Sequence, residues 1–300
     1  MKVLKWLLDS DPSIRWQVMR DLADETTEAI DAERARVVRE GWGAKLIAQQ
    51  TPAGYWGGDQ ERRNWLTTTY TLALLKDLGA NPAAEETRRA VGLLREQVTW
   101  WQLDGRSFFD GETEPCVNGM ILCAGAYFGQ ASDPLVNRLL DEQLSDGGWN
   151  CNAPKSKRTS FNTTICVLEG LLEYEKARGI VPAVTQARLR AQEYLLERRM
   201  FRSRTTGEVI EQEWVRYSFP TTWHYDVLRG LDYLRDAGVR PDERVAEAVD
   251  LVAKRRHQDG RWPLNVAHPD RLSFEMEAGV GRASRWNTLR ALRVLKWFES

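Results

Sequence analysis

The sequence predicts an all-α protein, an α/α toroid in which six helical hairpins form an inner and an outer ring of helices. Three observations support this prediction. Helical periodicity recurs along the whole chain, a Gln-Gly-Trp signature recurs between helices, and the two ends of the chain share a motif. No segment of alternating apolar residues predicts a strand. We therefore expect a single domain that spans residues 1–300.

Helices are expected in pairs, each with a charged first (outer) helix and a more apolar second (inner) helix. The first helices are expected at 3–9, 44–50, 93–97, 136–143, 191–201 and 249–258, and the second at 14–22, 67–79, 117–129, 163–179, 225–238 and 288–298. Most of the second segments end in Gly, the residue that favours a left-handed helix stop. Apolar second helices require burial on all sides, which an inner ring provides.

A signature of Gln, Gly and Trp separates the two helices of several hairpins. It occurs at 50–56 (QTPAGYW), 143–149 (QLSDGGW) and 258–262 (QDGRW), and a degenerate copy at 102–109 has Phe in place of Trp. A catalytic element would not recur in several repeats. We interpret each copy as a clasp, in which Gln caps the outer helix, Gly forms a left-handed turn and Trp packs back into the junction.

The two ends of the chain resemble each other. Residues 14–22 (IRWQVMRDL) and 284–292 (SRWNTLRAL) share the pattern R-W-[Q/N]-x-x-R-x-L. An open solenoid of hairpins would carry atypical polar units at its two ends. Terminal units that resemble each other instead favour a closed ring.

The composition indicates a globular chain with 42% hydrophobic and 28% charged residues and a net charge of -1. Charges of both signs are spread along the length, which argues against binding to nucleic acid or to an anionic membrane. The apolar start of the chain meets Asp9 too early for a secretory signal, and no apolar run is long enough for a transmembrane segment. Four cysteines without a CxxC pair suit a reducing compartment, so we expect a cytoplasmic protein.

The recurring signature resembles the repeat of squalene–hopene cyclases and the related repeat of protein prenyltransferase β subunits. This resemblance covers nearly the whole chain. It implies an α/α toroid with a central cavity lined by the N-terminal ends of the inner helices. The aspartate motifs DxDD and DDxxD of the cyclases are absent, so the cyclase mechanism is not carried over.

The resemblance to prenyltransferases also implies a zinc site. The D-x-C pair and the histidine of that family are similar to Glu114-Pro-Cys116 and to His224 in WHYD, and Cys151 lies in the loop of the repeat between them. Zn²⁺ takes S, N and O ligands, so Cys116, Cys151 and His224 are candidate ligands, and Glu114 and Asp226 are candidate acid–base residues. The alternative is that Cys116 is an ordinary core residue and His224 a hydrogen-bonded pocket residue.

The first turns of the inner helices, which would converge on one mouth of a ring, supply the candidate substrate contacts. These are Trp65, Phe161, Asn162, Trp223, Tyr225, Trp286 and Asn287. Asn, Ser and Thr are also ordinary helix caps. Together with the 13 tryptophans of the chain, these residues indicate a pocket with an apolar wall and a few polar groups.

We therefore expect a terpenoid cyclase/prenyltransferase-like protein that binds a mostly hydrophobic small molecule or peptide in a central cavity. Its expected chemistry is metal- or acid-assisted cyclisation, isomerisation or alkyl transfer. Two alternatives stay open: a carbohydrate-active α/α toroid, a hydrolase or lyase whose tryptophans stack on sugar rings, and a non-catalytic ligand- or peptide-binding toroid. The loops 201–220 and 263–283 have no assigned role.

Overall fold

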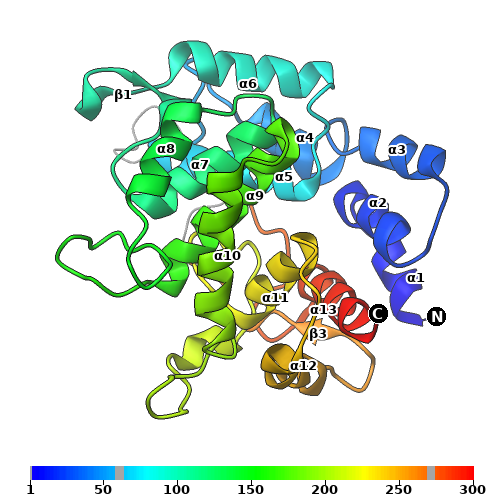
Figure 1. Cartoon of the computed structure of the whole chain (residues 1–300). Coiled ribbons are helices and arrows are strands. Elements are labelled where there is room, and N and C mark those ends of the chain that lie inside the picture. Colours follow the sequence, from blue (N-terminus) through cyan, green and yellow to red (C-terminus); the bar gives the residue numbers. More distant parts are fainter. Residues whose placement is uncertain (1, 58–63, 269–273) are drawn as a thin grey trace. The chain divides into compact units, whose positions relative to one another are not determined.

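The computed structural model describes residues 2–57, 64–268 and 274–300 (Figure 1). These residues form thirteen α-helices, which confirms the all-α fold class. The described chain divides into two compact units. Unit 1 contains residues 2–42, 195–268 and 274–300, and unit 2 contains residues 43–57 and 64–194. The single domain and the closed ring of hairpins stay predictions.

Unit 2 is built around one buried helix. Its helices are α4 (Gly41–Ala48), α5 (Asn64–Leu78), α6 (Glu85–Gln97), α7 (Pro115–Tyr127), α8 (Asp133–Asp141), α9 (Phe161–Arg178) and α10 (Pro182–Leu196). Helix α7 packs against both α5 and α9, and it is buried from Pro115 to Ala126. Its sequence, PCVNGMILCAGAY, has apolar and small residues all round, as expected of a helix with neighbours on every side.

Unit 1 brings the two ends of the chain together. Its helices are α1 (Lys2–Leu8), α2 (Pro12–Asp21), α3 (Thr27–Ala35), α11 (Val227–Asp236), α12 (Glu243–Lys254) and α13 (Arg285–Glu299). Helix α13 packs against α11, α12 and α2. The shared motif of the two ends lies on α2 and α13, where Arg293 donates a hydrogen bond of 2.7 Å to Gln17. The resemblance between the two ends therefore corresponds to a real contact between helices.

Two short strand pairs occur that no alternating apolar pattern indicates. Strand β1 (Thr99–Trp100) pairs with β2 (Arg106–Ser107), and β3 (Trp262–Pro263) pairs with β4 (Ala283–Ser284), both antiparallel. Strands of two residues have no room for an alternating pattern, so periodicity cannot reveal them. The second pair ties both ends of the loop 263–283 to the clasp around Trp262.

Several first helices are longer than their patterns predict. Helix α6 begins at Glu85 and α10 at Pro182, eight and nine residues before the predicted starts at 93 and 191. The missed turns contain few large apolar residues, which weakens their apolar periodicity. Among the described residues, no helix is both long and apolar enough to cross a lipid bilayer.

Candidate metal centre

Three copies of the predicted clasp share one hydrogen-bond pattern around their tryptophan. The indole N–H donates to a carbonyl ten residues earlier, in the preceding first helix. These bonds are Trp56 to Leu46 (2.6 Å), Trp149 to Leu139 (2.6 Å) and Trp262 to Val252 (2.7 Å). The backbone N–H of each tryptophan donates to a threonine hydroxyl on the following second helix, Thr68, Thr164 or Thr288. The tryptophan therefore joins the two helices of a hairpin, as the clasp interpretation predicts.

The glutamine of the clasp has a different role from the predicted one. Gln143 Nε2 donates to the carbonyls of Gly147 (2.7 Å) and of Ala187 in α10 (2.8 Å), so it binds the first helix of the next hairpin rather than its own. Gln50 repeats this pattern with Gly54 (3.0 Å) and with Ala90 in α6 (2.9 Å). The end of the glutamine's own helix is bound by the indole.

The third clasp has an arginine where the other two have glutamine. Arg256 lies six residues before Trp262, the spacing of Gln50 and Gln143 from their tryptophans, and its Nε donates to the Gly260 carbonyl at 3.4 Å. The assignment of Gln258 as the clasp glutamine is therefore wrong, and its side chain is exposed. Residue type alone suggested Gln258, whereas the distance to the tryptophan identifies Arg256.

The clasp at 143–149 holds Cys151 at the start of α9. Trp149 is fully buried, and its backbone N–H is bound by Thr164. The neighbouring Thr163 lies 3.4 Å from both the backbone nitrogen and the Sγ atom of Cys151. Two adjacent threonines on the first turn of α9 therefore position the tryptophan and the cysteine.

Glu114 and Cys116 lie at the start of α7, where the chain is held in a tight turn. The Glu112 carboxylate accepts hydrogen bonds from the Glu114 N–H (2.7 Å) and from the Thr113 hydroxyl (2.9 Å), and Asn118 binds the backbone of Glu112. Glu114 is the N-cap residue, but its side chain makes no capping bond. Its Oε2 atom instead lies 3.7 Å from Cys116 Sγ.

One carboxylate and two thiols converge at this point. The ligand atoms of Glu114, Cys116 and Cys151 all lie within 4.8 Å of one another. Ligands on a tetrahedral zinc ion are roughly 3.5–3.8 Å apart, given Zn–S bonds of about 2.3 Å and Zn–O bonds of about 2.0 Å. The donor types and their spacing therefore fit zinc. Cys116 is buried, Cys151 is half-buried and Glu114 is exposed, so the cluster has one side toward solvent.

The two thiols interact directly. The hydrogen bond between them raises the pKa of Cys116 and lowers the pKa of Cys151, and the Thr163 hydroxyl lowers the pKa of Cys151 further. Of the two thiols, Cys151 therefore has the lower pKa.

His224 and Asp226, the other predicted site residues, lie in unit 1. The His224 ring stacks on Trp223 and on His268, with centroid distances of 4.0 and 3.5 Å, and its Nδ1 atom is 3.0 Å from the Thr222 hydroxyl. Asp226 is 2% exposed and caps α11 by accepting a bond of 2.7 Å from the Arg229 N–H. Metal binding by His224 and acid–base catalysis by Asp226 stay predictions.

The predicted substrate contacts divide by burial. Trp286, Asn287, Tyr225 and Phe161 are buried, whereas Trp65, Asn162 and Trp223 are half-buried. Trp286 stacks on Phe219 at 4.2 Å, and the Tyr225 hydroxyl donates to the Met200 carbonyl. These contacts place the buried members in the packing of their own unit, and a role in substrate binding stays a prediction for all seven.

Sequence reasoning missed the contribution of Glu112 and Thr163, which hold the cluster. Both belong to short polar segments at the start of a helix, where Glu and Thr are common for local reasons. Glu277, in the loop 263–283, accepts bonds from the Ser284 hydroxyl (2.7 Å) and the Trp286 N–H (3.1 Å). These hydrogen bonds connect the loop to the start of α13. Burial raises the pKa of the Glu277 carboxyl group. The contacts of Glu112 stay within its own turn, whereas Thr163 reaches Cys151 across the loop before α9.

No protein-family model matches the sequence, and no curated protein matches it significantly. Among solved structures, a protein from Actinoplanes is similar at 18% identity and a TM-score of 0.49, covering 100% of this chain and 98% of the other. The type II terpene cyclase MstE from Scytonema, in its apo form, has 16% identity, a TM-score of 0.43 and coverages of 95% and 87%. A variant of that cyclase bound to geranylgeranyl dihydroxybenzoate has 15% identity, a TM-score of 0.43 and coverages of 95% and 86%. Similarities at this level assign neither a family nor a function to this chain.

Proposed function

We propose that this chain is a zinc-dependent enzyme of the terpenoid cyclase/prenyltransferase type, which acts on a mostly hydrophobic small molecule or peptide. Glu114, Cys116 and Cys151 would hold the metal, and the reaction would be an alkyl transfer or a cyclisation. The observation that supports this proposal is the convergence of two thiols and a carboxylate from two separate segments of unit 2.

The donor set suits a catalytic zinc ion better than a structural one. Structural sites are closed by four protein ligands, whereas catalytic sites have three and leave one position open. Thiolate donors also select zinc over magnesium or calcium. A zinc ion held here would polarise a substrate group or keep a substrate thiol ionised at neutral pH.

The local structure keeps the three donors available. The Glu114 carboxylate is not engaged in capping α7, and Cys116 lies on the first turn of that helix, beside Glu114. Cys151 is positioned by the clasp and by Thr163, so it need not be ordered when a metal binds. Neither the carbohydrate-active alternative nor the non-catalytic alternative has a comparable cluster in its favour among the described residues.

Metal analysis of the purified protein tests this proposal. We expect about one zinc ion per chain, and a loss of most of it in the variants Cys116→Ser and Cys151→Ser. Cys123→Ala, which changes a buried cysteine outside the cluster, is the matched control and should keep its zinc. His224→Ala examines the remaining predicted ligand in the same measurement.

Cobalt substitution provides a second readout. Co²⁺ bound to thiolates gives charge-transfer absorption in the near ultraviolet, and each cysteine variant should reduce its intensity. Wild-type protein without stoichiometric zinc, or a Cys116→Ser/Cys151→Ser double variant that retains it, would show that the proposal is wrong. Zinc-loaded protein should then consume thiol and release pyrophosphate from an allylic prenyl diphosphate if the reaction is an alkyl transfer.

A further inference from the structure

All four cysteines of the chain lie in unit 2, and two of them lie close to each other. The sulfur atoms of Cys116 and Cys151 are within 4.8 Å of one another. Cys151 is half-buried, and the cluster is open toward solvent at the exposed Glu114. Cys123 and Cys166, in contrast, are 6% and 0% exposed within α7 and α9. Only the first pair therefore combines proximity with access for a small reagent.

The geometry allows the two sulfur atoms to form a bond. A disulfide bond is about 2.05 Å long, so the sulfurs must approach by at most about 3 Å. A change between staggered rotamers moves a cysteine sulfur by about this distance. Cys151 is the residue that moves, because it lies in a turn, whereas Cys116 lies on the first turn of α7.

The turn around Cys151 is held by its neighbours. The Asn150 side-chain amide donates to the Arg158 carbonyl (2.7 Å), and the Asn152 N–H donates to Asn150 Oδ1 (2.8 Å). Neither hydrogen bond involves Cys151. Its sulfur can therefore approach Cys116 while the turn keeps its structure.

We propose that Cys116 and Cys151 form a reversible disulfide that closes the metal centre under oxidising conditions. The oxidant is a hydroperoxide, such as hydrogen peroxide. The more accessible thiol, Cys151, is oxidised to a sulfenic acid, and the peroxide is reduced to water. The Cys116 sulfur then attacks the sulfenic sulfur. The disulfide bond forms, and the thiol proton of Cys116 leaves with the hydroxyl group as a second water.

The disulfide and a metal ion compete for the same two sulfur atoms. Zinc binds thiolates, and a disulfide sulfur carries no negative charge. After oxidation, Glu114 alone remains of the three donors. Zinc binding and disulfide formation therefore exclude each other, and a cellular thiol such as glutathione would restore the two cysteines by exchange. The closing of the centre rests on the proposed function, whereas the bond itself rests only on the two sulfurs.

Oxidation of the zinc-free chain tests the disulfide independently of any metal. The folded full-length chain is treated with a chelator and a small excess of hydrogen peroxide, and its free thiols are then counted in guanidinium chloride. The count should fall from four to two, with a mass loss of about 2 Da. Peptide mapping should find Cys116 linked to Cys151, and dithiothreitol should restore all four thiols.

Matched variants assign the reaction to the pair. Cys123→Ala/Cys166→Ala retains only Cys116 and Cys151, and it should still lose both thiols. Cys116→Ser leaves the Cys151 sulfenic acid without a thiol to react with, so this acid should accumulate and be trapped by dimedone. Circular dichroism checks that each variant is folded before oxidation.

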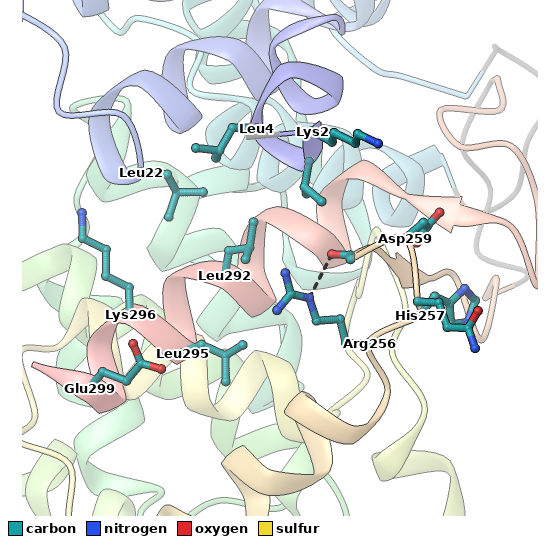
Figure 2. Close-up of a pocket in the computed structure, with 13 residues that line it drawn as sticks. Lys2, Leu4, Leu22, Arg256, His257, Asp259, Leu292, Leu295, Lys296 and Glu299 are labelled. Carbon is teal, nitrogen blue, oxygen red and sulfur yellow. Dashed lines mark hydrogen bonds between the residues drawn. The ribbon is translucent and has the colours of Figure 1, made fainter.

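A pocket in unit 1 provides an internal reference for the oxidation (Figure 2). It has a volume of about 720 Å³ and is lined by residues 2–4 of α1, Leu22, residues 256–260 and the second half of α13. This lining contains neither cysteine nor methionine. Hydrogen exchange should therefore change at the starts of α7 and α9 on oxidation and stay unchanged in α1 and α13. Equal changes in both units would indicate general damage and contradict a local switch.

Oxidation of the zinc-loaded chain tests the competition. One zinc ion should be released for each disulfide formed, as measured with a chromogenic chelator. The zinc-loaded chain should also lose its thiols at least about fivefold more slowly than the zinc-free chain, because bound metal favours the reduced state.

Three results would overturn the proposal. These are four free thiols after oxidation of the zinc-free chain, a cross-link between other cysteines such as Cys116 and Cys166, and sulfinic acid at Cys151 beside a free Cys116. A chain that binds zinc but forms no disulfide would refute the switch and leave the proposed function intact. A chain that forms the disulfide but never binds zinc would refute the proposed function, and the closing of a metal centre with it.

Discussion

The α7–α9 pair of unit 2 and the α2–α13 pair of unit 1 hold second helices together by opposite means. In the first pair the backbones touch, since a Cβ atom on Gly119 would lie 2.5 Å from the Cys166 carbonyl, and one on Gly170 would lie 2.5 Å from the Gly119 carbonyl. In the second pair, Arg293 forms a buried ion pair with Asp21. The first contact depends on the absence of side chains, and the second on two side chains of opposite charge.

Equivalent second helices in different repeats are therefore held together by different kinds of contact. Glycine allows the α7 and α9 backbones to approach, and the close packing gains dispersion energy along their whole length. Charged groups between α2 and α13 must be neutralised by partners of opposite charge, because an isolated charge in such a site is costly. The charged contact therefore requires a partner helix with the opposite charge at one position. The glycine contact instead requires a partner helix whose backbone can approach closely.

The largest effect is expected from breaking the ion pair. Asp21→Ala leaves the buried Arg293 guanidinium without its carboxylate, and it should lower the free energy of unfolding by about 3 kcal/mol. The double variant Asp21→Leu/Arg293→Met removes both charges and should cost less than the single change. Urea unfolding of the three proteins measures this order. A double variant less stable than Asp21→Ala would show that the pair itself stabilises unit 1.

A smaller loss is expected at the glycine contact. Gly119→Ala forces α7 and α9 apart, because the new methyl group meets backbone atoms that cannot rotate away, and it should cost about 2–3 kcal/mol. The midpoint of urea unfolding, followed by circular dichroism, measures this change. A variant as stable as wild type would mean that the two backbones are less closely packed than the structure shows.

Stability at acid pH should depend on the same ion pair. Burial alone would raise the pKa of Asp21, but the hydrogen bond from Arg20 and the charge of Arg293 lower that pKa below its usual value of 3.8. The carboxylate therefore contributes stability above about pH 4, and this contribution is lost as the pH falls through the lowered pKa. The stability difference between wild type and Asp21→Asn should be present at pH 7 and shrink below pH 4. Thermal unfolding across this range checks it, and a difference that grows on acidification would contradict it.

The smallest expected effect is a gain. Gly92, in the middle of α6, has helical geometry and no atom within 4 Å of an added Cβ position. Gly92→Ala should therefore stabilise the protein by about 0.5–1 kcal/mol, because alanine favours the helix and the space is free. A comparison of the unfolding free energies of Gly92→Ala and Gly119→Ala separates the general effect of replacing a helical glycine from the effect of close backbone packing.

Most of the fold could be predicted because its signals are local. Helical periodicity identified the paired helices, and the recurrence of Gln, Gly and Trp identified the clasps, since both depend on residues within a few turns of one another. The same reasoning failed at Arg256. There, the equivalent position is occupied by a different residue type with the same hydrogen-bonding ability, and a nearby glutamine was mistaken for it.

The sequence predicted which residues belong to the candidate site, but not that they lie together. Glu114, Cys116 and Cys151 are recognisable as ligand types next to helix starts, but nothing in the pattern shows that the two segments meet. Thr163 was invisible as a support for the same reason, since it contacts Cys151 from the next helix. Hydrogen bonds across the chain depend on the positions of distant segments, which local spacing does not contain.

The sequence by itself determined most of the helices, the tryptophans of the clasps and the likeness of the two chain ends, because each is a repeated short-range pattern of apolar, turn-forming and capping residues. Only the tertiary structure decided that Cys151 lies against Cys116, that the clasp glutamines bind the next hairpin, and that a pocket lies beside the short α1. The physical reason is the same in each case. These features are contacts between surfaces that form only when whole helices pack, so they depend on lengths and positions that no single segment encodes.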